Sequence, residues 1–308
     1  TEAELEQKKK DACPSCGACS FIGTASTMQI LTEALGLAMP GTALIPIGEG
    51  MLRQAAYDAG KQSMHLRDLG IHFKDIVTLE ALENAIVVHA AISGSTNAVM
   101  HLMALAHALE IPLEPQDFDR IHRKVPYLLN CRPTGDYPAE YFYGAGGVPR
   151  LQLELRDLLH LDVLTVTGKT LGENLKQIED SNFFAERSTY LEKLGLKPID
   201  VIASAEKPLA EGGSLAVLYG NLAPEGAVIK HTAAPKNMHE VILRARPFDS
   251  EEEALDAIFN EQIEAGDAII IRYEGAAGSG MPEMFYTTEA ISANPELSSS
   301  VALITDGR

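Results

Sequence analysis

Three of the four cysteines of the chain lie close together, at Cys13, Cys16 and Cys19. Thiolates are soft ligands that suit zinc or an iron–sulfur cluster, and a regular short spacing allows one loop to wrap them around a single inorganic centre. Cys131 lies far downstream, so neither a ferredoxin-type run of four cysteines nor a paired zinc-ribbon spacing is completed locally. The pattern favours a metal role for at least one thiol over a set of free thiols, some of them buried as small hydrophobes.

The segment after the cysteines is predicted to begin a helix. Ser26 followed by Gln29 is a capping-box pattern, and the apolar residues around it have helical spacing up to Pro40. The cysteine loop then adjoins a helix N-terminus, whose partial positive charge favours a thiolate or a bound anion. Such a position suits either a cluster or a substrate carboxylate.

The run 86–92 is strongly apolar, as in a buried strand or a buried helix. A second predicted helix begins after this run. The short polar stretch 93–97 opens a predicted helix over 98–109, and its backbone donors could hold an anion. A satisfied helix cap is the alternative interpretation, because Ser, Thr and Asn favour that position without any ligand.

The composition limits the class of protein. The chain of 308 residues is 46% hydrophobic, has no uninterrupted apolar run of about 18 residues, and has a polar, charged stretch at 1–10. We therefore expect no membrane span, no signal peptide and a cytoplasmic location. The formal net charge of -18 opposes binding to nucleic acid and to anionic lipid. It also repels a free carboxylate substrate, so a local cation or metal must hold one.

The predicted fold class is α/β, in two domains. Residues 1–196 are expected to form a layered α/β domain that carries the cysteine motif, and 197–308 a β-rich, barrel-like domain. The charged stretch 179–197 is expected to connect them. Both ends of the chain look cut, because it has no initiator Met and its last residues directly follow an apparent strand. Each domain is therefore expected to be incomplete at its outer end.

The second half of the chain alternates short β runs with turns. Strands are predicted at 214–219, 227–230, 239–245, 268–273 and 300–304. A helix is predicted from Ser250, with Glu253 at the capping-box position. The loop 274–284 is rich in small residues and carries Glu274 and Glu283. Bare glycine backbone beside a carboxylate lets a metal or a substrate approach closely.

Five ordered motifs run over essentially the whole chain. They are Gly17-Ala18-Cys19 with Gly23-Thr24-Ala25-Ser26-Thr27-Met28, Gly94-Ser95-Thr96-Asn97, Gly220-Asn221-Leu222-Ala223-Pro224-Glu225-Gly226, Gly278-Ser279-Gly280-Met281-Pro282-Glu283-Met284 and Thr305-Asp306-Gly307-Arg308. Together they resemble the motifs of the dihydroxy-acid and sugar-acid dehydratases, the superfamily that includes phosphogluconate dehydratase. The resemblance implies a hydro-lyase that converts a 2,3-dihydroxy acid to a 2-keto-3-deoxy acid with loss of water. It also implies an iron–sulfur cluster (2Fe–2S or 4Fe–4S) acting as a Lewis acid on the leaving hydroxyl, and a Mg²⁺ ion that holds the substrate.

The resemblance also implies site residues. Cys19 corresponds to one of the family's three cluster cysteines, whereas Cys13 and Cys16 match neither of the others. Glu283 is expected to bind Mg²⁺. Contacts with the acid substrate are expected from the motif residues Ser95, Thr96, Asn97, Asp306 and Arg308.

Two features of the family are absent from the sequence. One is an upstream Cys-Asp-Lys motif, which supplies a cluster ligand together with an aspartate and a modified lysine for Mg²⁺. The other is the serine usually taken as the base, which would fall just beyond Arg308. The chain is therefore expected to be the middle of a longer enzyme, and it offers no assignable catalytic residue.

Two classes of function follow from these patterns. The first is the hydro-lyase, acting on a small-molecule acid. An aldonic sugar acid is favoured over a branched-chain dihydroxy acid, because the stretch 23–28 and Val125-Pro126 resemble the aldonic-acid group. The resemblance suggests a homodimer or homotetramer. The second class is a metal-binding module around Cys13, Cys16 and Cys19 without catalysis, or an inactive fragment. Metal analysis separates the two classes, because iron with acid-labile sulfide would indicate the hydro-lyase and one zinc ion per chain would indicate the metal-binding module.

Overall fold

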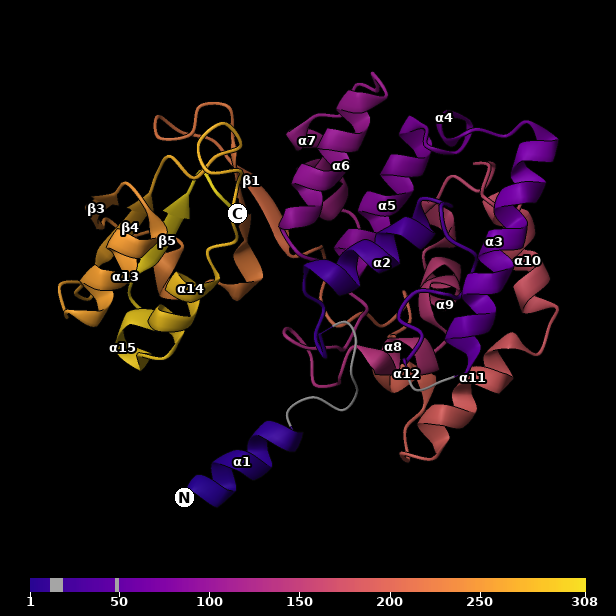
Figure 1. Ribbon diagram of the computed structural model, residues 1–308, viewed down its shortest axis with the longest axis horizontal. Helices are drawn as coiled ribbons and strands as arrows, with labels where there is room; N and C mark the ends of the chain where they lie inside the picture. Colours follow the sequence, from indigo (N-terminus) through magenta and orange to yellow (C-terminus); the bar gives the residue numbers. More distant parts are fainter. Residues whose placement is uncertain (12–18, 48–49) are drawn as a thin grey trace. The chain divides into compact units, whose positions relative to one another are not determined.

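The computed structural model describes residues 1–11, 19–47 and 50–308 (Figure 1). Cys13 and Cys16 lie outside the described residues. The described chain divides into two compact units, Thr1–His231 and Thr232–Arg308. In the part of the chain that the structure describes, no helix is long and apolar enough to cross a membrane.

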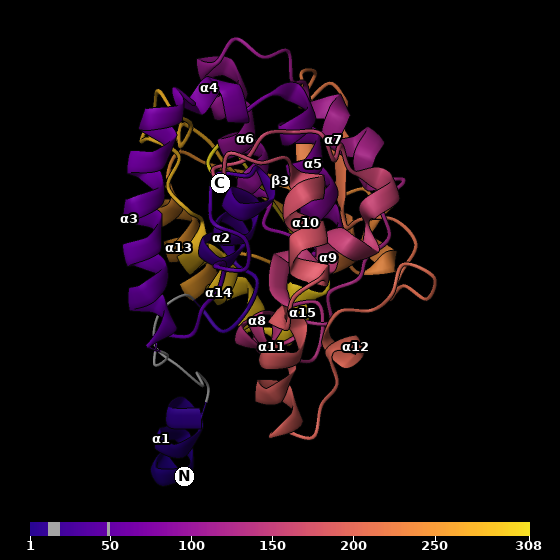
Figure 2. The ribbon, with the colours of Figure 1, turned by 90° about the vertical axis from the view of Figure 1, so that its right-hand side faces the viewer.

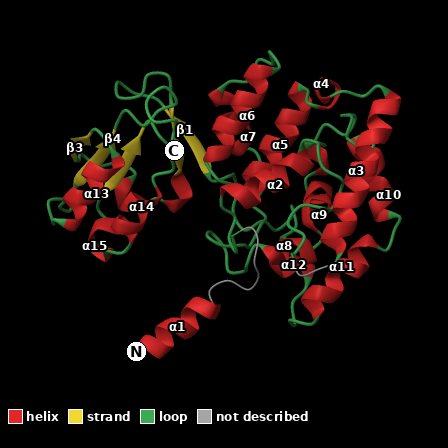
Figure 3. Ribbon diagram, in the orientation of Figure 1, coloured by secondary structure: helices red, strands yellow, loops and turns green. Residues whose placement is uncertain are grey.

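The first unit is mainly helical (Figure 3). Its helices are α1 Glu2–Asp11, α2 Thr24–Ala34, α3 Met51–Leu69, α4 Phe73–Ile76, α5 Leu79–Ala91, α6 Asn97–Ala108, α7 Pro115–His122, α8 Glu140–Gly144, α9 Gly147–Glu154, α10 Leu171–Glu179, α11 Phe183–Glu192 and α12 Pro198–Val201. The strands β1 Leu215–Leu218 and β2 Ala227–Lys230 complete it. A helix was predicted over 98–109, and α6 confirms it within one residue at each end.

Helix α5 is the centre of this unit. It packs against α2, α6 and α7, and Figures 1 and 2 both show it beside α7. The apolar run 86–92 falls at its C-terminal end, so the structure decides for a buried helix rather than a buried strand. A helix that is apolar on all sides is stable only when neighbours cover all of its faces. Thr78 begins α5 by accepting a hydrogen bond from the amide of Ala81.

Strands β1 and β2 form an antiparallel hairpin whose register pairs Leu215 with Lys230. The hairpin is attached to α7, because the amide of Val217 donates to a carboxylate oxygen of Asp119 at 3.2 Å. This attachment makes the hairpin part of the first compact unit, which therefore extends to His231 rather than ending at the expected boundary of 196.

The second unit is an open α/β layer. Its strands β3 Arg244–Phe248, β4 Asp267–Ile271 and β5 Ala302–Thr305 form a parallel sheet in the order β3-β4-β5. Helices α13 Glu251–Phe259, α14 Phe285–Ser292 and α15 Pro295–Ser298 lie between the strands in sequence. Ser250 caps α13 by accepting from the amide of Glu253 at 3.2 Å, as predicted.

The α/β class is confirmed, whereas the barrel-like arrangement is not. The described strands make one two-stranded and one three-stranded sheet, and neither closes on itself. Four of the five strands were predicted close to where they lie, but the strand predicted at 239–245 was wrong over most of its length, because β3 begins at Arg244, and the pairing of the strands was not predicted. Parallel neighbours joined by helices give an open layer, in which helices rather than further strands cover the sheet.

Two local predictions are wrong. Helix α2 begins at Thr24 with Gly23 as its N-cap, and Ser26 lies inside the first turn, where its hydroxyl donates to the carbonyl of Cys19 at 3.4 Å. Gln29 accepts from the amide of Leu44 instead of closing a capping box.

The stretch 179–197 is also no simple connection, because it contains α11, whose Leu191 is fully buried in the core of the first unit.

The burial of Leu191 predicts a clear difference between two leucines of this segment. Leu191→Ala should lower the free energy of unfolding by about 2–5 kcal/mol, because it leaves a cavity in the core. Leu194, which is 47% exposed, is the matched control, and Leu194→Ala should stay within about 0.5 kcal/mol of the unchanged protein. Urea unfolding of both variants measures this. Equal, small effects would mean that the segment is a connection after all.

Candidate functional site

A polar cluster lies where helices α2 and α6 begin. The hydroxyls of Thr24 and Ser95 are 3.1 Å apart, and the side-chain amide of Asn97 donates to the Thr24 hydroxyl at 2.7 Å. The backbone amide of Asn97 donates to the Ser95 hydroxyl at 3.3 Å. Thr24, Ser95 and Thr96 are partly exposed. Residues 71 positions apart in the sequence therefore form one accessible polar surface.

The cluster has one hydroxyl proton to spare. Each of the two hydroxyl oxygens already accepts a hydrogen bond from Asn97, and the contact between Thr24 and Ser95 uses one of their two protons. The second proton has no acceptor among the residues that the structure describes. It is available to an oxygen atom of a ligand, next to the amino ends of two helices, where partial positive charge favours an anion.

The loop that carries Ser95 is tightly fixed. The Ser95 amide donates to the Thr27 hydroxyl at 3.1 Å, and the Ser95 carbonyl is 2.9 Å from Nε2 of His89. Ser93 has a φ of 51°, in the left-handed region that non-glycine residues rarely occupy. Its carbonyl accepts from Nζ of Lys230 at 2.7 Å. The backbone of the loop is thus held by a helix, a histidine and a lysine.

Lys230 brings a positive charge to this loop from the end of β2. Burial lowers the pKa of its ammonium group to about 8. The group therefore remains mostly protonated at neutral pH. It places a positive charge beside the loop that carries Ser95, within a strongly acidic chain.

His89 and His122 form a buried pair behind the loop, with His89 Nδ1 and His122 Nε2 3.0 Å apart. Burial lowers the pKa of His89 to about 4, and the positive charge of Lys230 acts in the same direction. Burial lowers the pKa of His122 to about 2, with further contributions from His89, His231 and Lys230. Both rings are therefore neutral at physiological pH.

Cys19 is exposed, and its carbonyl accepts from Ser26, so it lies beside the first turn of α2 as expected. Cys131 is buried, and burial raises the pKa of its thiol to about 12. A thiol in that state is a poor metal ligand, because a thiolate is required.

The site residues of the second unit lie together at the carboxyl ends of β4 and β5. Asp306 accepts from the amides of Tyr273 and Glu274, at 3.1 and 2.9 Å, and so fixes the loop that follows β4. A guanidinium nitrogen of Arg308 is 3.9 Å from a carboxylate oxygen of Glu283. Outside the carboxyl ends of parallel strands is where open α/β sheets bind ligands. The structure thus brings Glu283, Asp306 and Arg308 to one edge.

This loop is also braced from within. Glu274 is buried, accepts from the amide of Glu251 at 3.1 Å and receives a hydrogen bond from the Ser279 hydroxyl. A Cβ atom added at Gly278 would lie only 2.1 Å from the carbonyl oxygen of Tyr273. Glycine is therefore required there because the loop backbone folds closely against itself, whereas the sequence had predicted close approach by a metal or a substrate.

The described residues do not by themselves complete a metal or cluster site. No group of three or more His, Cys, Asp or Glu residues within 1–11, 19–47 and 50–308 is arranged to hold a metal ion. Cys19 offers one thiolate and Glu283 one carboxylate, in different units. A cluster and a Mg²⁺ ion need more protein ligands than these single groups supply.

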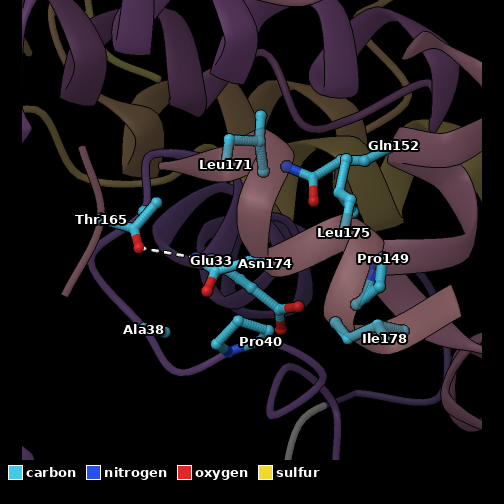
Figure 4. A pocket seen from close by; sticks show the side chains of 11 residues that line it. Glu33, Ala38, Pro40, Pro149, Gln152, Thr165, Leu171, Asn174, Leu175 and Ile178 are labelled. Atoms are coloured by element: carbon cyan, nitrogen blue, oxygen red, sulfur yellow. Dashed lines mark hydrogen bonds between the residues drawn. The ribbon is translucent and has the colours of Figure 1, made fainter. Parts of the chain in front are cut away.

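A pocket of the first unit, with an empty volume of about 280 Å³, has a structural rather than a chemical role (Figure 4). Glu33 in its wall accepts from the amides of Gly41 and Ala43 at 2.5 and 2.8 Å, and so holds the turn after α2. Burial raises the pKa of Glu33 to about 7, against the effect of these hydrogen bonds and of Arg187. Elsewhere in the wall the side-chain amide of Asn174 donates to Thr165 at 2.8 Å.

The fold, with polar side chains gathered where its regular elements end, is that of an enzyme, and comparison with known proteins identifies the family. The model described as dihydroxy-acid/6-phosphogluconate dehydratase N-terminal matches residues 1–174, and the corresponding C-terminal model matches 200–308. The chain therefore belongs to the dihydroxy-acid/6-phosphogluconate dehydratase family, which confirms the resemblance seen in its motifs. The match to the N-terminal model ends at residue 174 and the match to the C-terminal model begins at residue 200, whereas the boundary between the compact units follows His231.

Several curated relatives are similar over the whole of this chain. Proteins named dihydroxy-acid dehydratase are 43% identical in Oleidesulfovibrio alaskensis, 42% in Caldanaerobacter subterraneus subsp. tengcongensis and 42% in Sulfurisphaera tokodaii. In each case the match covers 100% of this chain and 53% of the relative. The chain thus spans about half the length of the curated relatives it matches.

Three residues of the site were not predicted from the sequence. Lys230 ends a strand that was predicted, but nothing in the pattern showed that its ammonium group reaches the carbonyl of Ser93. His89 lies in the apolar run and His122 in an ordinary amphipathic helix. A polar ring within an apolar run is the one signal that was available, because a buried imidazole needs a partner.

The histidine pair makes stability sensitive to acid. An unfolded histidine has a pKa near 6.5, above the folded values of about 4 and about 2, so unfolding takes up protons below about pH 6.5. The stabilisation is present above that pH and is lost on acidification. Glu33 acts oppositely, because its raised pKa gives a stabilisation that is lost as the pH rises from about 4.5 through about 7. On unfolding, the two histidines take up about two protons and Glu33 releases about one, so the net uptake is about one proton. The free energy of unfolding should therefore fall by about 1.4 kcal/mol for each unit by which the pH is lowered from 6.5 to 5.

Urea unfolding across this range measures the slope. In the variant with both His89→Gln and His122→Gln, the free energy of unfolding should no longer fall on acidification, and the opposite pH dependence due to Glu33 should remain. An identical slope in that variant and in the unchanged protein would show that the histidines are not buried in the neutral form.

Proposed function

We propose that the protein is a hydro-lyase that removes water from a 2,3-dihydroxy acid. The proton leaves C2, the hydroxyl leaves C3, and the resulting enol becomes a 2-keto acid. The observation that carries this proposal is family membership over both halves of the chain, 1–174 and 200–308. The name of the relatives, dihydroxy-acid dehydratase, supports the same reaction.

The polar cluster of the first unit is proposed to bind the acid. The spare hydroxyl proton of the Thr24–Ser95 pair donates to a substrate oxygen, and Thr96 and Asn97 complete the start of α6 around it. The ammonium group of Lys230 lowers the electrostatic cost of bringing a carboxylate to a chain of net charge -18. These groups bind and orient, and they do not themselves remove a proton.

The second unit is proposed to supply further substrate and metal contacts. Arg308 is a fixed cation that donates to the carbonyl of Met281 at 3.0 Å, and it suits a carboxylate or hydroxyl oxygen. Asp306 acts by holding the loop. Glu283 is proposed as one ligand of Mg²⁺, and Cys19 as one ligand of an iron–sulfur cluster of the 2Fe–2S or 4Fe–4S type. Their remaining ligands are not among the described residues, so no chemical step is assigned to either group here.

The kind of acid is a separate part of the proposal. The stretch 23–28 and Val125-Pro126 favoured an aldonic acid, whereas the relatives carry the broader name dihydroxy-acid dehydratase. We therefore propose a 2,3-dihydroxy acid as the substrate class, with aldonic and branched-chain acids as its two candidate members. A metal-binding module without catalysis is not favoured, because the match to an enzyme family covers both units. A homodimer or homotetramer, located in the cytoplasm, stays a prediction.

The first experiment tests the function and the cluster ligand together. The full-length protein, prepared without oxygen, should form a 2-keto acid from an aldonate or from a branched-chain 2,3-dihydroxy acid. Cys19→Ser should lose iron and at least 100-fold of the turnover, on the order of what removal of a group that acts within a catalytic unit costs. Iron and keto acid are measured on the same samples.

Cys13→Ser is the matched control and should keep its iron. The reverse pattern, with iron lost from Cys13→Ser and kept in Cys19→Ser, would overturn the ligand assignment. No keto acid from either class of substrate would overturn the proposed function.

A second experiment tests Glu283 as a Mg²⁺ ligand. Glu283→Gln keeps the volume of the side chain and removes its charge, so it should weaken Mg²⁺ dependence and reduce turnover by about 100-fold or more while iron absorption stays the same. Glu289, an exposed carboxylate on α14, is the control, and Glu289→Gln should change neither property. Unchanged Mg²⁺ dependence in Glu283→Gln would place the ion elsewhere.

A further inference from the structure

A continuous row of hydrogen bonds joins strand β1 to the loop that carries Ser95. It runs from the amide of Leu215 to Nδ1 of His122 at 3.3 Å, from His122 Nε2 to His89 Nδ1 at 3.0 Å, and from His89 Nε2 to the carbonyl of Ser95 at 2.9 Å. Each link joins residues that are distant in sequence or lie on different elements. All of them belong to the first unit.

The two ends of the row determine where every proton lies. The amide of Leu215 can only donate, so His122 Nδ1 accepts and carries no proton. A neutral His122 therefore has its proton on Nε2 and donates to His89 Nδ1. The carbonyl of Ser95 can only accept, so His89 has its proton on Nε2. One arrangement of two neutral rings, both with the proton on Nε2, satisfies all three bonds.

Both rings are also confined sterically. A Cβ atom at Gly94 would lie 2.4 Å from the His89 ring, and one at Gly213 would lie 2.5 Å from His122 Nδ1. The glycine backbone therefore lies directly against both rings, and a side chain at either glycine would displace the ring beside it. Protonation of His89 on Nδ1 would put two N–H groups face to face at the central bond, and protonation of His122 on Nδ1 would put an N–H group against the amide of Leu215, so either event would break the row.

The row ends on the residue whose hydroxyl faces the proposed ligand. The amide of Ser95 is bonded to Thr27 and its hydroxyl to Thr24 and Asn97, and its carbonyl accepts both from His89 and from the amide of Ala98 at 3.1 Å. Among these partners, His89 is the one that connects the loop to His122 and strand β1. Loss of that bond would leave the carbonyl of Ser95 with the amide of Ala98 as its remaining partner, so the loop and the Ser95 hydroxyl would be held less firmly.

We propose that His89 and His122 are positioning residues for substrate binding, a neutral imidazole relay that holds the Ser95 hydroxyl in place from strand β1. The proposal rests on the proposed role of Ser95 in binding the acid. The histidines do not contact the substrate. They act by fixing the loop, with the ammonium group of Lys230 as a second attachment through the carbonyl of Ser93.

The tautomers are tested directly in the unchanged full-length protein. Long-range ¹H–¹⁵N spectra of protein labelled at histidine should show two neutral rings that both carry the proton on Nε2 and that do not titrate between pH 5.5 and 8. A ring protonated on Nδ1, or a titration in this range, would overturn the relay. This result does not depend on turnover, so it stands apart from the test of the proposed function.

A matched pair of variants tests positioning. In His122→Asn the shorter side chain places an oxygen near the position of Nδ1, so the bond to His89 is lost. In His122→Gln the longer side chain places an amide nitrogen near the position of Nε2, so the bond to His89 is kept. His122→Asn should raise KM about 10-fold, since a buried hydrogen bond contributes about 1 kcal/mol and leaving its partner unsatisfied costs more. Its kcat should change less than about threefold, and its iron content should not change.

His122→Gln should restore KM to within about threefold of the unchanged protein. Hydrogen exchange at the Ser95 amide should be faster in His122→Asn than in His122→Gln, a difference that does not need substrate. The exposed His107 on α6 is the control, and His107→Asn should change neither measurement. Equal KM values and equal exchange in the two His122 variants would overturn the proposal. Faster exchange in His122→Asn without any turnover by the unchanged protein would support the relay and overturn the proposed function.

Discussion

The first unit depends on one constraint, the burial of helix α5, in which ten of the 13 residues are buried. Burial of its apolar residues supplies the driving force of this core, but a buried polar group is costly unless it is hydrogen-bonded. Two polar side chains of α5 are fully buried, Asn84 and His89. Asn84 exchanges two hydrogen bonds with the backbone of His160, and His89 uses both nitrogens on His122 and Ser95. The same requirement that stabilises the core thus determines where the polar loop lies.

The second unit meets a different constraint with a similar result. Parallel strands end at the same edge, so the loops after β4 and β5 are neighbours. Asp306 accepts from two consecutive amides of the first loop, and this carboxylate is needed because those amides have no strand partner at the edge. The carboxylate of Glu283 and the guanidinium of Arg308 are thereby brought together. Each unit therefore places polar side chains where regular structure ends.

Much of this arrangement was predictable from the sequence, and the exceptions have physical reasons. Four of the five strands, helix α6 and the Ser250 cap follow from local periodicity and capping residues, which depend on near neighbours. The start of α2 did not follow, because the hydroxyl of Ser26 has a competing acceptor in the carbonyl of Cys19. The motifs located Ser95, Asn97 and Glu283, whereas Lys230 and His122 are linked to the loop across more than 30 residues of sequence. Such contacts exist only after the core has formed.

The close contact of glycine backbone with the two imidazole rings also restricts how this part of the molecule varies between species. With a Cβ atom at Gly94 placed 2.4 Å from the His89 ring, and one at Gly213 placed 2.5 Å from His122, a side chain at either glycine is compatible only with a smaller partner. The four positions therefore form two coupled pairs, 94 with 89 and 213 with 122. A side chain at either glycine therefore requires a smaller residue at its partner position, whereas a smaller residue in place of a histidine makes no demand on the glycine.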